Sequence, residues 1–257
     1  MRGGDIDVRC LMANSYSQHL ADLFLLPFLL HAAGGQPGTF VELGAFDGVT
    51  YSNTFALEHC GNWTGLLIEA SPRNYERLKA ETRRRVHKVH SAVCSHEQQA
   101  RGLEMSGVGS GPSLALKELD DAKPGRRSKS TARPTDPISN VTDTVKVPCQ
   151  PLSSLMASAG LARGAHFLSL DVEGAEEMVL STVDPAIFSV VLIEMSGVNP
   201  GKDARTHNML LRSGFWQARG INLSGNSVFV SHKIAQNTPS KYVAWCHWQS
   251  HACRGKA

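Results

Sequence analysis

Five short apolar runs recur along the chain, and amphipathic segments separate them. Each run has about five residues and is hydrophobic almost throughout, which is typical of parallel strands whose two faces are both covered. The runs are Thr39–Leu43, Gly65–Glu69, Val89–Val93, His166–Asp171 and Val190–Glu194. Helices between successive strands imply right-handed crossovers, so the pattern predicts a doubly wound α/β sheet.

The segments beside these runs carry helix and hairpin signals. Ser71 can cap a helix whose first residue is Pro72, followed by the charged stretch Arg73–Arg85. The basic run 83–85 is interpreted as the solvated end of this helix. Near the end of the chain, Phe215–Ile221 and Ser227–His232 flank a turn that contains Ser-Gly, which is typical of an antiparallel hairpin. We therefore expect a mostly parallel sheet with an antiparallel hairpin at one edge.

The domain organisation follows from changes in composition along the chain. One domain is expected over residues 1–233. A stretch rich in Gly, Pro, Ser and charge interrupts it around 102–147, which indicates a loose surface insertion. Residues 234–257 follow the last expected strand and are interpreted as a C-terminal appendage.

Charge and hydropathy argue against two kinds of partner. The 257 residues carry a net charge of +3, well short of the basic surface of a dedicated nucleic-acid binder, so no nucleic-acid partner is expected. The longest apolar run, Leu23–Ala33, is interrupted by Pro27 and His31 and is shorter than the roughly 20 residues of a membrane-spanning helix. It predicts a buried helix and no membrane span. The oligomeric state stays open.

Cysteines and asparagines leave the cellular compartment open. The six cysteines are spread along the chain without a CxxC pair, so a zinc ribbon or a dense disulfide framework is not expected, whereas individual disulfides are permitted. Acceptor motifs for N-glycosylation lie at Asn62, Asn140 and Asn222. The sequence is compatible with either a cytoplasmic or a secretory-lumenal protein.

The first run closes in an acidic turn that contains two glycines. Ligands of open α/β sheets bind at the carboxyl ends of the strands, so this turn is a candidate site. Gly44 and Gly48 follow a G-x-x-x-G spacing rather than the G-x-G-x-x-G spacing of dinucleotide enzymes. Glu42 and Asp47 would repel a pyrophosphate but suit a cationic or hydroxyl-bearing ligand. S-adenosylmethionine, with a sulfonium and an ammonium group, is such a ligand.

Further polar positions follow the second and third runs. Glu69 and Ala70 end the second run, where a carboxylate can accept hydrogen bonds from the two ribose hydroxyls of an adenosine ligand. The third run closes near Ser91 and Ala92, whose backbone groups could contact an adenine. These positions indicate where the nucleoside part of such a cofactor would lie.

Three carboxylates follow the fourth and fifth runs. Strand alternation would place Asp171 and Glu173 on the same side if Glu173 remains extended, and Glu194 ends the neighbouring run. These groups could act as a general base, as partners of the cofactor ammonium, or as ligands of a hard metal ion such as Mg²⁺. The sequence leaves these roles open.

Five stretches of the chain resemble one enzyme family. They are FVELGAFDGVTYSNT, GNWTGLLIEASPRNYERL, FLSLDVEGAEEMVL, VVLIEMSG and, near the end of the chain, NSVFVSHK. They are similar to the FkbM-type family of S-adenosylmethionine-dependent methyltransferases, and the D-V-E-G-A-E element is the most specific of the matches. The resemblance implies a Rossmann-like class I methyltransferase fold, with a seven-stranded sheet whose final strand is antiparallel.

The resemblance also implies site residues, position by position. Catalytic roles fall on Asp171 and Glu173. Cofactor contacts fall on Glu42, Gly44, Ala45, Phe46, Asp47, Gly48, Ser52, Asn53, Thr54, Glu69, Ala70, Ala92 and Asp171. The chain departs from the family at Ala21, where many relatives carry a glutamine between the positions of Gln18 and Asp22.

The function implied by the resemblance is O-methylation of a hydroxyl on a sugar, a glycan or another natural product. The partner is then a small-molecule or glycan acceptor. Two alternatives remain at this point. One is a nucleotide-dependent oxidoreductase on a related fold, which the missing third glycine and the acidic turn disfavour. The other is a module that binds the cofactor without catalysis.

Overall fold

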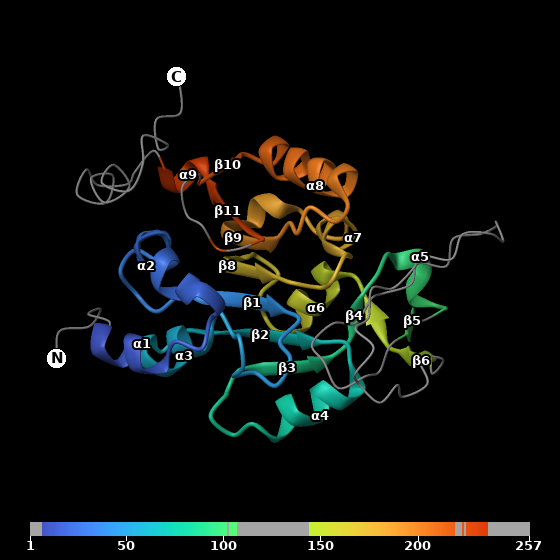
Figure 1. The fold of residues 1–257 in the computed structure, drawn as a ribbon, viewed down its shortest axis with the longest axis horizontal. Coiled ribbons are helices and arrows are strands. Elements are labelled where there is room, and N and C mark those ends of the chain that lie inside the picture. The colour runs from blue at the N-terminus through green and yellow to red at the C-terminus, as the bar shows by residue number, and fades with distance from the viewer. Residues whose placement is uncertain (1–6, 102, 107–143, 219–222, 224, 236–257) are drawn as a thin grey trace, which may run out of the picture.

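Seven strands form one sheet in the order β10-β11-β9-β8-β1-β2-β3 (Figure 1). The computed structural model describes residues 7–101, 103–106, 144–218, 223 and 225–235. The strands are β1 (Thr39–Leu43), β2 (Thr64–Glu69), β3 (His87–His90), β8 (Ala165–Leu170), β9 (Phe188–Glu194), β10 (Phe215–Gln217) and β11 (Asn226–Ser231). All neighbours from β9 to β3 pair in parallel, whereas β11 is antiparallel to both β9 and β10. The predicted fold class is confirmed.

The chain changes direction across the sheet at β1. It adds β2 and β3 on one side of β1, and later adds β8 and β9 on the other side. This topological switch leaves a crevice outside the carboxyl ends of the central strands, because the connections on either side lead away from it. The ends of β1 and β8 are therefore the natural position of a binding site.

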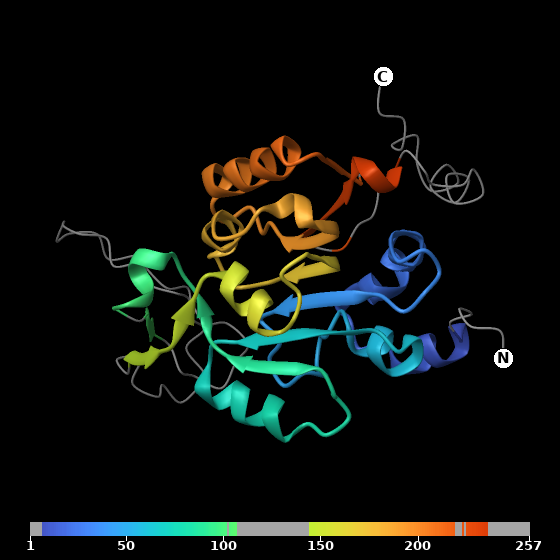
Figure 2. The same cartoon turned by 180° about the vertical axis from the view of Figure 1, so that it is seen from behind.

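Helices cover both faces of the sheet (Figures 1 and 2). They are α1 (Val8–Asn14), α2 (Ala21–Ala32), α3 (Phe55–Gly61), α4 (Pro72–Ala80), α5 (His96–Gln99), α6 (Leu152–Ser158), α7 (Glu176–Ser181), α8 (Pro200–Arg212) and α9 (His232–Ala235). Val41 of β1 belongs to the same core as Leu155 of α6, and Phe40 belongs to the core that contains Leu25 of α2. Alternate residues of one strand thus enter different cores, which explains why the runs are hydrophobic throughout.

Several predicted boundaries are wrong. The strand predicted over Phe215–Ile221 ends at Gln217. The run Val89–Val93 is not one strand: β3 ends at His90, and the chain leaves the sheet after Ser91 as β4 (Ala92–Val93). β4 pairs in parallel with β7 (Cys149–Gln150), and the backbone N–H of Ala92 donates to the carbonyl of Pro148 at 2.8 Å. The helix after Ser71 ends at Ala80 rather than continuing to Arg85.

The two ends of the expected insertion form paired strands. β5 (Leu103–Ser106) and β6 (Thr144–Val147) pair in an antiparallel ribbon, so the ends of the 102–147 segment are not loose. The ribbon lies beyond the carboxyl ends of the central strands (Figure 1). Residues 107–143 and most of the predicted appendage, 236–257, lie outside the described residues.

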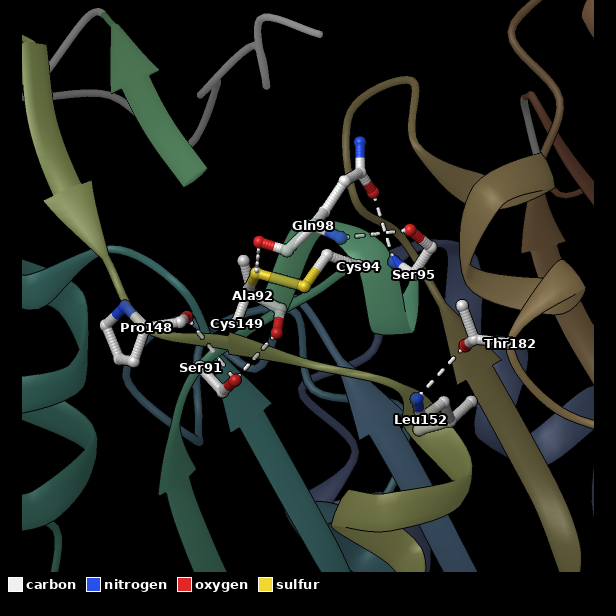
Figure 3. Close-up of a disulfide and its surroundings, with 9 residues drawn as sticks. All are labelled: Ser91, Ala92, Cys94, Ser95, Gln98, Pro148, Cys149, Leu152 and Thr182. Carbon is white, nitrogen blue, oxygen red and sulfur yellow. Dashed lines mark hydrogen bonds between the residues drawn. A yellow bond between two sulfur atoms is a disulfide. The ribbon is translucent and has the colours of Figure 1, made fainter. Parts of the chain in front are cut away.

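Two disulfides join distant segments. Cys10 pairs with Cys60, which ties α1 to α3, and Cys94 pairs with Cys149, which ties the end of β4 to β7 (Figure 3). Cys246 and Cys253 lie outside the described residues. Within the described ranges, none of the helices has the length and apolar character needed to cross a membrane.

Candidate active site

A cavity of about 340 Å³ opens at the carboxyl ends of the central strands. Its volume lies within the range of roughly 300–1,000 Å³ that is usual for small-molecule sites. Most of the predicted site residues line it. They are Glu42, Gly44, Ala45, Phe46, Ser52, Asn53, Glu69, Ala70, Ala92, Asp171 and Glu173.

Gly44 brings the ends of β1 and β8 into direct contact. Its φ of +76° is in the left-handed region, and a Cβ at this position would lie 1.9 Å from the carbonyl oxygen of Asp171. The backbone N–H of Asp171 in turn donates to the carbonyl of Leu43 at 3.3 Å. Only glycine permits this approach, which sets the position of Asp171 at the cavity wall.

The remaining predicted contacts, Asp47, Gly48 and Thr54, do not line the cavity. The Asp47 carboxylate accepts hydrogen bonds from the backbone N–H groups of Val49 and Thr50, at 2.9 and 2.7 Å, so it shapes the turn. A Cβ on Gly48 would lie 2.6 Å from the Leu78 side chain. These residues support the site from behind rather than facing a ligand.

Glu42 holds the segment that carries the Ser-Asn-Thr element. One of its oxygens accepts from the hydroxyls of Ser52, at 2.9 Å, and Thr54, at 2.5 Å. The other accepts from the backbone N–H of Asn53 at 2.8 Å. Glu42 is almost completely buried. Its carboxylate therefore fixes Asn53 at the cavity wall.

Arg84 completes this buried network. The sequence favoured a solvated helix end for the basic stretch 83–85, but the Arg84 side chain is only 1 % exposed. Its Nε lies 2.6 Å from a carboxylate oxygen of Glu58, and its terminal nitrogens donate to Ser52 and Thr54 at 2.9 and 2.8 Å. A residue expected at the surface is thus the charged centre behind the cavity wall.

The segment before α2 also reaches the cavity. Ser17 forms an isolated parallel bridge with Tyr51, and its hydroxyl donates to the side-chain oxygen of Asn53 at 2.5 Å. The amide nitrogen of Asn53 donates to the hydroxyl of Ser169 at 2.9 Å. Gln18 and Ala21 line the cavity beside this chain of hydrogen bonds. The departure from the family pattern at Ala21 is therefore located at the site itself.

Glu69 stands at the end of β2 with its carboxylate held on both oxygens. The backbone N–H groups of Phe46 and Ser71 each donate to it at 2.8 Å. Burial raises the pKa of Glu69, while these hydrogen bonds oppose the shift. Phe46 has a φ of +51°, a conformation that non-glycine residues rarely adopt. That conformation lets its N–H group reach Glu69.

Asp171 and Glu194 form an interacting pair of carboxyl groups. Both are open to the cavity, yet the surrounding protein removes part of their hydration. This desolvation, followed by the charges of Glu173 and nearby acids, raises the pKa of Asp171 to about 6. Desolvation, followed by the charge of Asp171, raises the pKa of Glu194 to about 7. Two close carboxylates resist double ionisation, so the pair holds a proton at higher pH than ordinary carboxyls do.

Glu173 lies near this pair, but strand alternation does not place it there. β8 ends at Leu170, and Glu173 has a φ of +54° in a loop. The condition that Glu173 remains extended is therefore not met. Glu176 shapes the loop by accepting from the backbone N–H of Gly174 at 3.0 Å and by pairing with Lys202.

Among the described residues, the charged side chains that line the cavity are all acidic. The residues that line it include five carboxylates, Glu42, Glu69, Asp171, Glu173 and Glu194, but no lysine, arginine or histidine from the described part of the chain. Such a wall attracts a cation and repels a phosphate. Among the described residues, no three His, Cys, Asp or Glu side chains are arranged to hold a metal ion, so the Mg²⁺ expectation gains no support.

Comparison with models of protein families shows to which family the chain belongs. The model of the FkbM methyltransferase domain matches residues 42–217, more than half of the chain. The chain belongs to the FkbM methyltransferase family. The match includes the end of β1 and the whole of β2, β8 and β9, which together build the cavity, so family and fold support a methyltransferase rather than the oxidoreductase alternative.

The other proteins compared with this FkbM methyltransferase are distant from it in sequence. No curated protein matches it. A precorrin-6y C5,15-methyltransferase from Geobacter metallireducens GS-15 is similar in structure, with a TM-score of 0.40 and 10% identity over 82% of this chain and 86% of that chain. A candidate RNA methyltransferase from Pyrococcus horikoshii gives a TM-score of 0.39 and 10% identity over 90% of each chain.

Proposed function

We propose that this chain is an S-adenosylmethionine-dependent O-methyltransferase that acts on a hydroxyl of a sugar, a glycan or another natural product. The observation that carries the proposal is the carboxyl pair Asp171 and Glu194 at the cavity wall. A hydroxyl is a weak nucleophile until its proton is removed, and a base whose pKa lies near the working pH performs that step best.

The cavity suits the cofactor in shape and charge. Gly44 leaves its wall free of a Cβ, and the five carboxylates complement a sulfonium and an ammonium group. When bound, S-adenosylmethionine supplies a methyl group on a positively charged sulfur. The carboxylate of Glu69 faces the cavity, where it can accept from the ribose hydroxyls. Ala70, Ser91 and Ala92 would surround the adenine of the cofactor.

The acceptor would lie between the carboxyl pair, Asp171 and Glu194, and the opening of the cavity. Asp171 accepts the hydroxyl proton as the acceptor oxygen attacks, and Glu194, in its protonated form, donates a hydrogen bond that stabilises the charged state of Asp171. Correct orientation of the two reactants can contribute roughly 7–11 kcal/mol. Tyr51 lines the cavity and is 52% exposed, so its ring offers a face on which a sugar ring can stack.

The test is transfer of labelled methyl from S-adenosylmethionine to a panel of acceptors that carry hydroxyl, amine, thiol or activated carbon groups. We expect methyl ethers from hydroxyl acceptors. Asp171→Asn should lower kcat by about 10²–10⁴-fold, the contribution of a positioned base, with little change in cofactor affinity. Exclusive methylation of nitrogen, sulfur or carbon would refute O-methylation, and cofactor binding without any transfer would favour a non-catalytic module.

A further inference from the structure

The turn between α3 and β2 carries a sequence motif that the methyltransferase site does not use. Asn62, Trp63 and Thr64 form the pattern N-x-T, which is an acceptor motif for N-glycosylation when x is not proline. Such motifs also occur by chance, so the structure must decide whether this one is presented to an enzyme. The other two, at Asn140 and Asn222, lie outside the described residues.

The turn exposes the motif. Asn62 ends α3 in the left-handed conformation, with φ of +55°, and its backbone N–H is satisfied by the carbonyl of Leu57. Asn62 and Thr64 are both exposed, whereas Trp63 between them is buried and packs against Gly38. Within the described ranges, no hydrogen bond restrains the Asn62 amide. The motif therefore lies at the surface on an anchored turn.

The disulfides provide an independent indication of the compartment. Cys60, two residues before Asn62, is bonded to Cys10, and Cys94 is bonded to Cys149. In the described part of the chain no cysteine is left as a free thiol. Structural disulfides form and persist in oxidising compartments and are rare in the cytosol. N-glycosylation takes place in the same oxidising compartments.

We propose that Asn62 is an N-glycosylation site and that the chain folds in an oxidising lumen. The amide nitrogen of Asn62 would form a bond to the anomeric carbon of an oligosaccharide carried on a lipid diphosphate. The bond from that carbon to the diphosphate oxygen breaks, the lipid diphosphate departs, and the amide loses a proton. For each disulfide, two thiols pass two electrons and two protons to a disulfide-containing oxidoreductase, whose own disulfide becomes two thiols.

A glycan at Asn62 is compatible with the proposed enzyme activity. β2 runs from Thr64 to Glu69, so at about 3.3 Å per residue its two ends are roughly 16 Å apart. Glu69 lines the cavity, whereas Asn62 lies before the opposite end of the strand. α1 and α3 occupy the end of the sheet away from β4 and β5 (Figures 1 and 2). The glycan would extend from the end of the sheet opposite the cavity.

The test uses the chain purified from the cells that naturally make it. Peptides are mapped by mass spectrometry without reduction, before and after treatment with peptide-N-glycosidase. We expect a glycan on the peptide that contains Asn62, conversion of Asn62 to aspartate by the glycosidase, and a disulfide between the Cys10 and Cys60 peptides. An unmodified Asn62, or free thiols at Cys10 and Cys60, would overturn the proposal.

Variants produced in the same cells separate the motif from other causes. Asn62→Gln and Thr64→Ala should remove the glycan from this peptide, whereas Thr64→Ser should retain it, because serine also completes the motif. A glycan on the same peptide of Asn62→Gln would contradict the assignment. Deglycosylated wild-type protein and Asn62→Gln should keep methyl transfer unchanged, so failure of this inference is distinguishable from failure of the proposed function.

Discussion

Asp171 and Glu194 stand at matching ends of two neighbouring parallel strands, one residue beyond the paired positions Leu170 and Ile193. This register brings two carboxyl groups to one cavity wall, where each is partly desolvated. Their pKa values rise above the ordinary values of 3.8 and 4.5. The register of the two strands therefore produces a pair of carboxyl groups whose pKa values lie close to neutral pH.

The pH dependence of methyl transfer should reflect this pair. The base Asp171 acts only when it is deprotonated, and its pKa is raised to about 6, so the rate should fall as the pH is lowered through about 6. The rate should also fall above about pH 7, where Glu194 loses the proton that it donates to Asp171. Ordinary carboxyls would keep activity to about pH 4. The measurement is kcat at saturating cofactor and acceptor across this range. A rate that stays constant down to about pH 5 would argue against the pair.

Glu194→Gln tests the same pH dependence from within the pair. Glutamine cannot ionise but can still donate a hydrogen bond to Asp171, as protonated Glu194 does, so the acidic limb of the kcat profile near pH 6 should remain, whereas the fall in kcat above about pH 7 should disappear. Glu177→Gln is the control, because Glu177 pairs with Arg205 near the surface. If both variants shift the profile equally, the effect is not specific to the pair.

Glu69→Ala should weaken binding of S-adenosylhomocysteine by about 10–100-fold. Hydrogen bonds to a charged group contribute roughly 1.5–3 kcal/mol, and about 1.4 kcal/mol corresponds to tenfold in affinity. The measurement is isothermal titration calorimetry on the folded variant. Glu76→Ala, at a position on α4 that does not line the cavity, should bind like wild type. Equal affinity of Glu69→Ala and wild type would remove Glu69 from the proposed ribose contacts.

The features that the sequence predicts correctly depend on the pattern of residues that are close together in the chain. β1 was predicted at its observed bounds because both of its faces are buried, and Glu69 was expected at the cavity because it ends a strand. The features that were missed depend on distant partners. The strand break at Ser91 reflects pairing of β4 with β7, which lies more than 50 residues later in the chain. No short-range pattern records such a contact.

Arg84 illustrates the same limit for a charged side chain. A basic run at the end of a predicted helix usually indicates a solvated surface, because burial of an unpaired charge is costly. Here the partners Glu42 and Glu58 come from β1 and α3, which the sequence alone does not bring together. The backbone strain at Glu173 has a similar origin, since the 171–176 loop is shaped by Glu176 and Lys202.

Arg84→Ala should destabilise the fold strongly. Removing one partner of a buried ion pair leaves an uncompensated charge and typically costs about 3–5 kcal/mol. Urea unfolding should show this loss, and cofactor affinity should fall because Ser52 and Thr54 lose a common donor. Arg85→Ala, at an exposed side chain next in sequence, should change the free energy of unfolding by less than about 0.5 kcal/mol. Similar effects of the two variants would contradict the buried network.

The two disulfides should differ in their effect on the cofactor. Loss of either by paired Cys→Ser substitution should lower the free energy of unfolding by about 2–4 kcal/mol. Cys94–Cys149 fixes β4, whose Ala92 and Val93 line the cavity, so its removal should also weaken binding of S-adenosylhomocysteine. Removal of Cys10–Cys60 should leave that affinity unchanged. Calorimetry at a temperature where both variants are folded makes the comparison, and equal affinities in the two variants would contradict it.

Gly44 and Gly35 provide a matched pair for the close approach of β1 and β8. Their φ values are +76° and +73°, so alanine meets similar backbone strain at both positions. A Cβ on Gly35 would have nothing within 4 Å, whereas a Cβ on Gly44 would lie 1.9 Å from the Asp171 carbonyl oxygen. Gly35→Ala should therefore cost about 1 kcal/mol. Gly44→Ala should cost several times more in urea unfolding, and should lower kcat because Asp171 is displaced. Equal losses of stability would mean that the two strand ends are not in contact in solution.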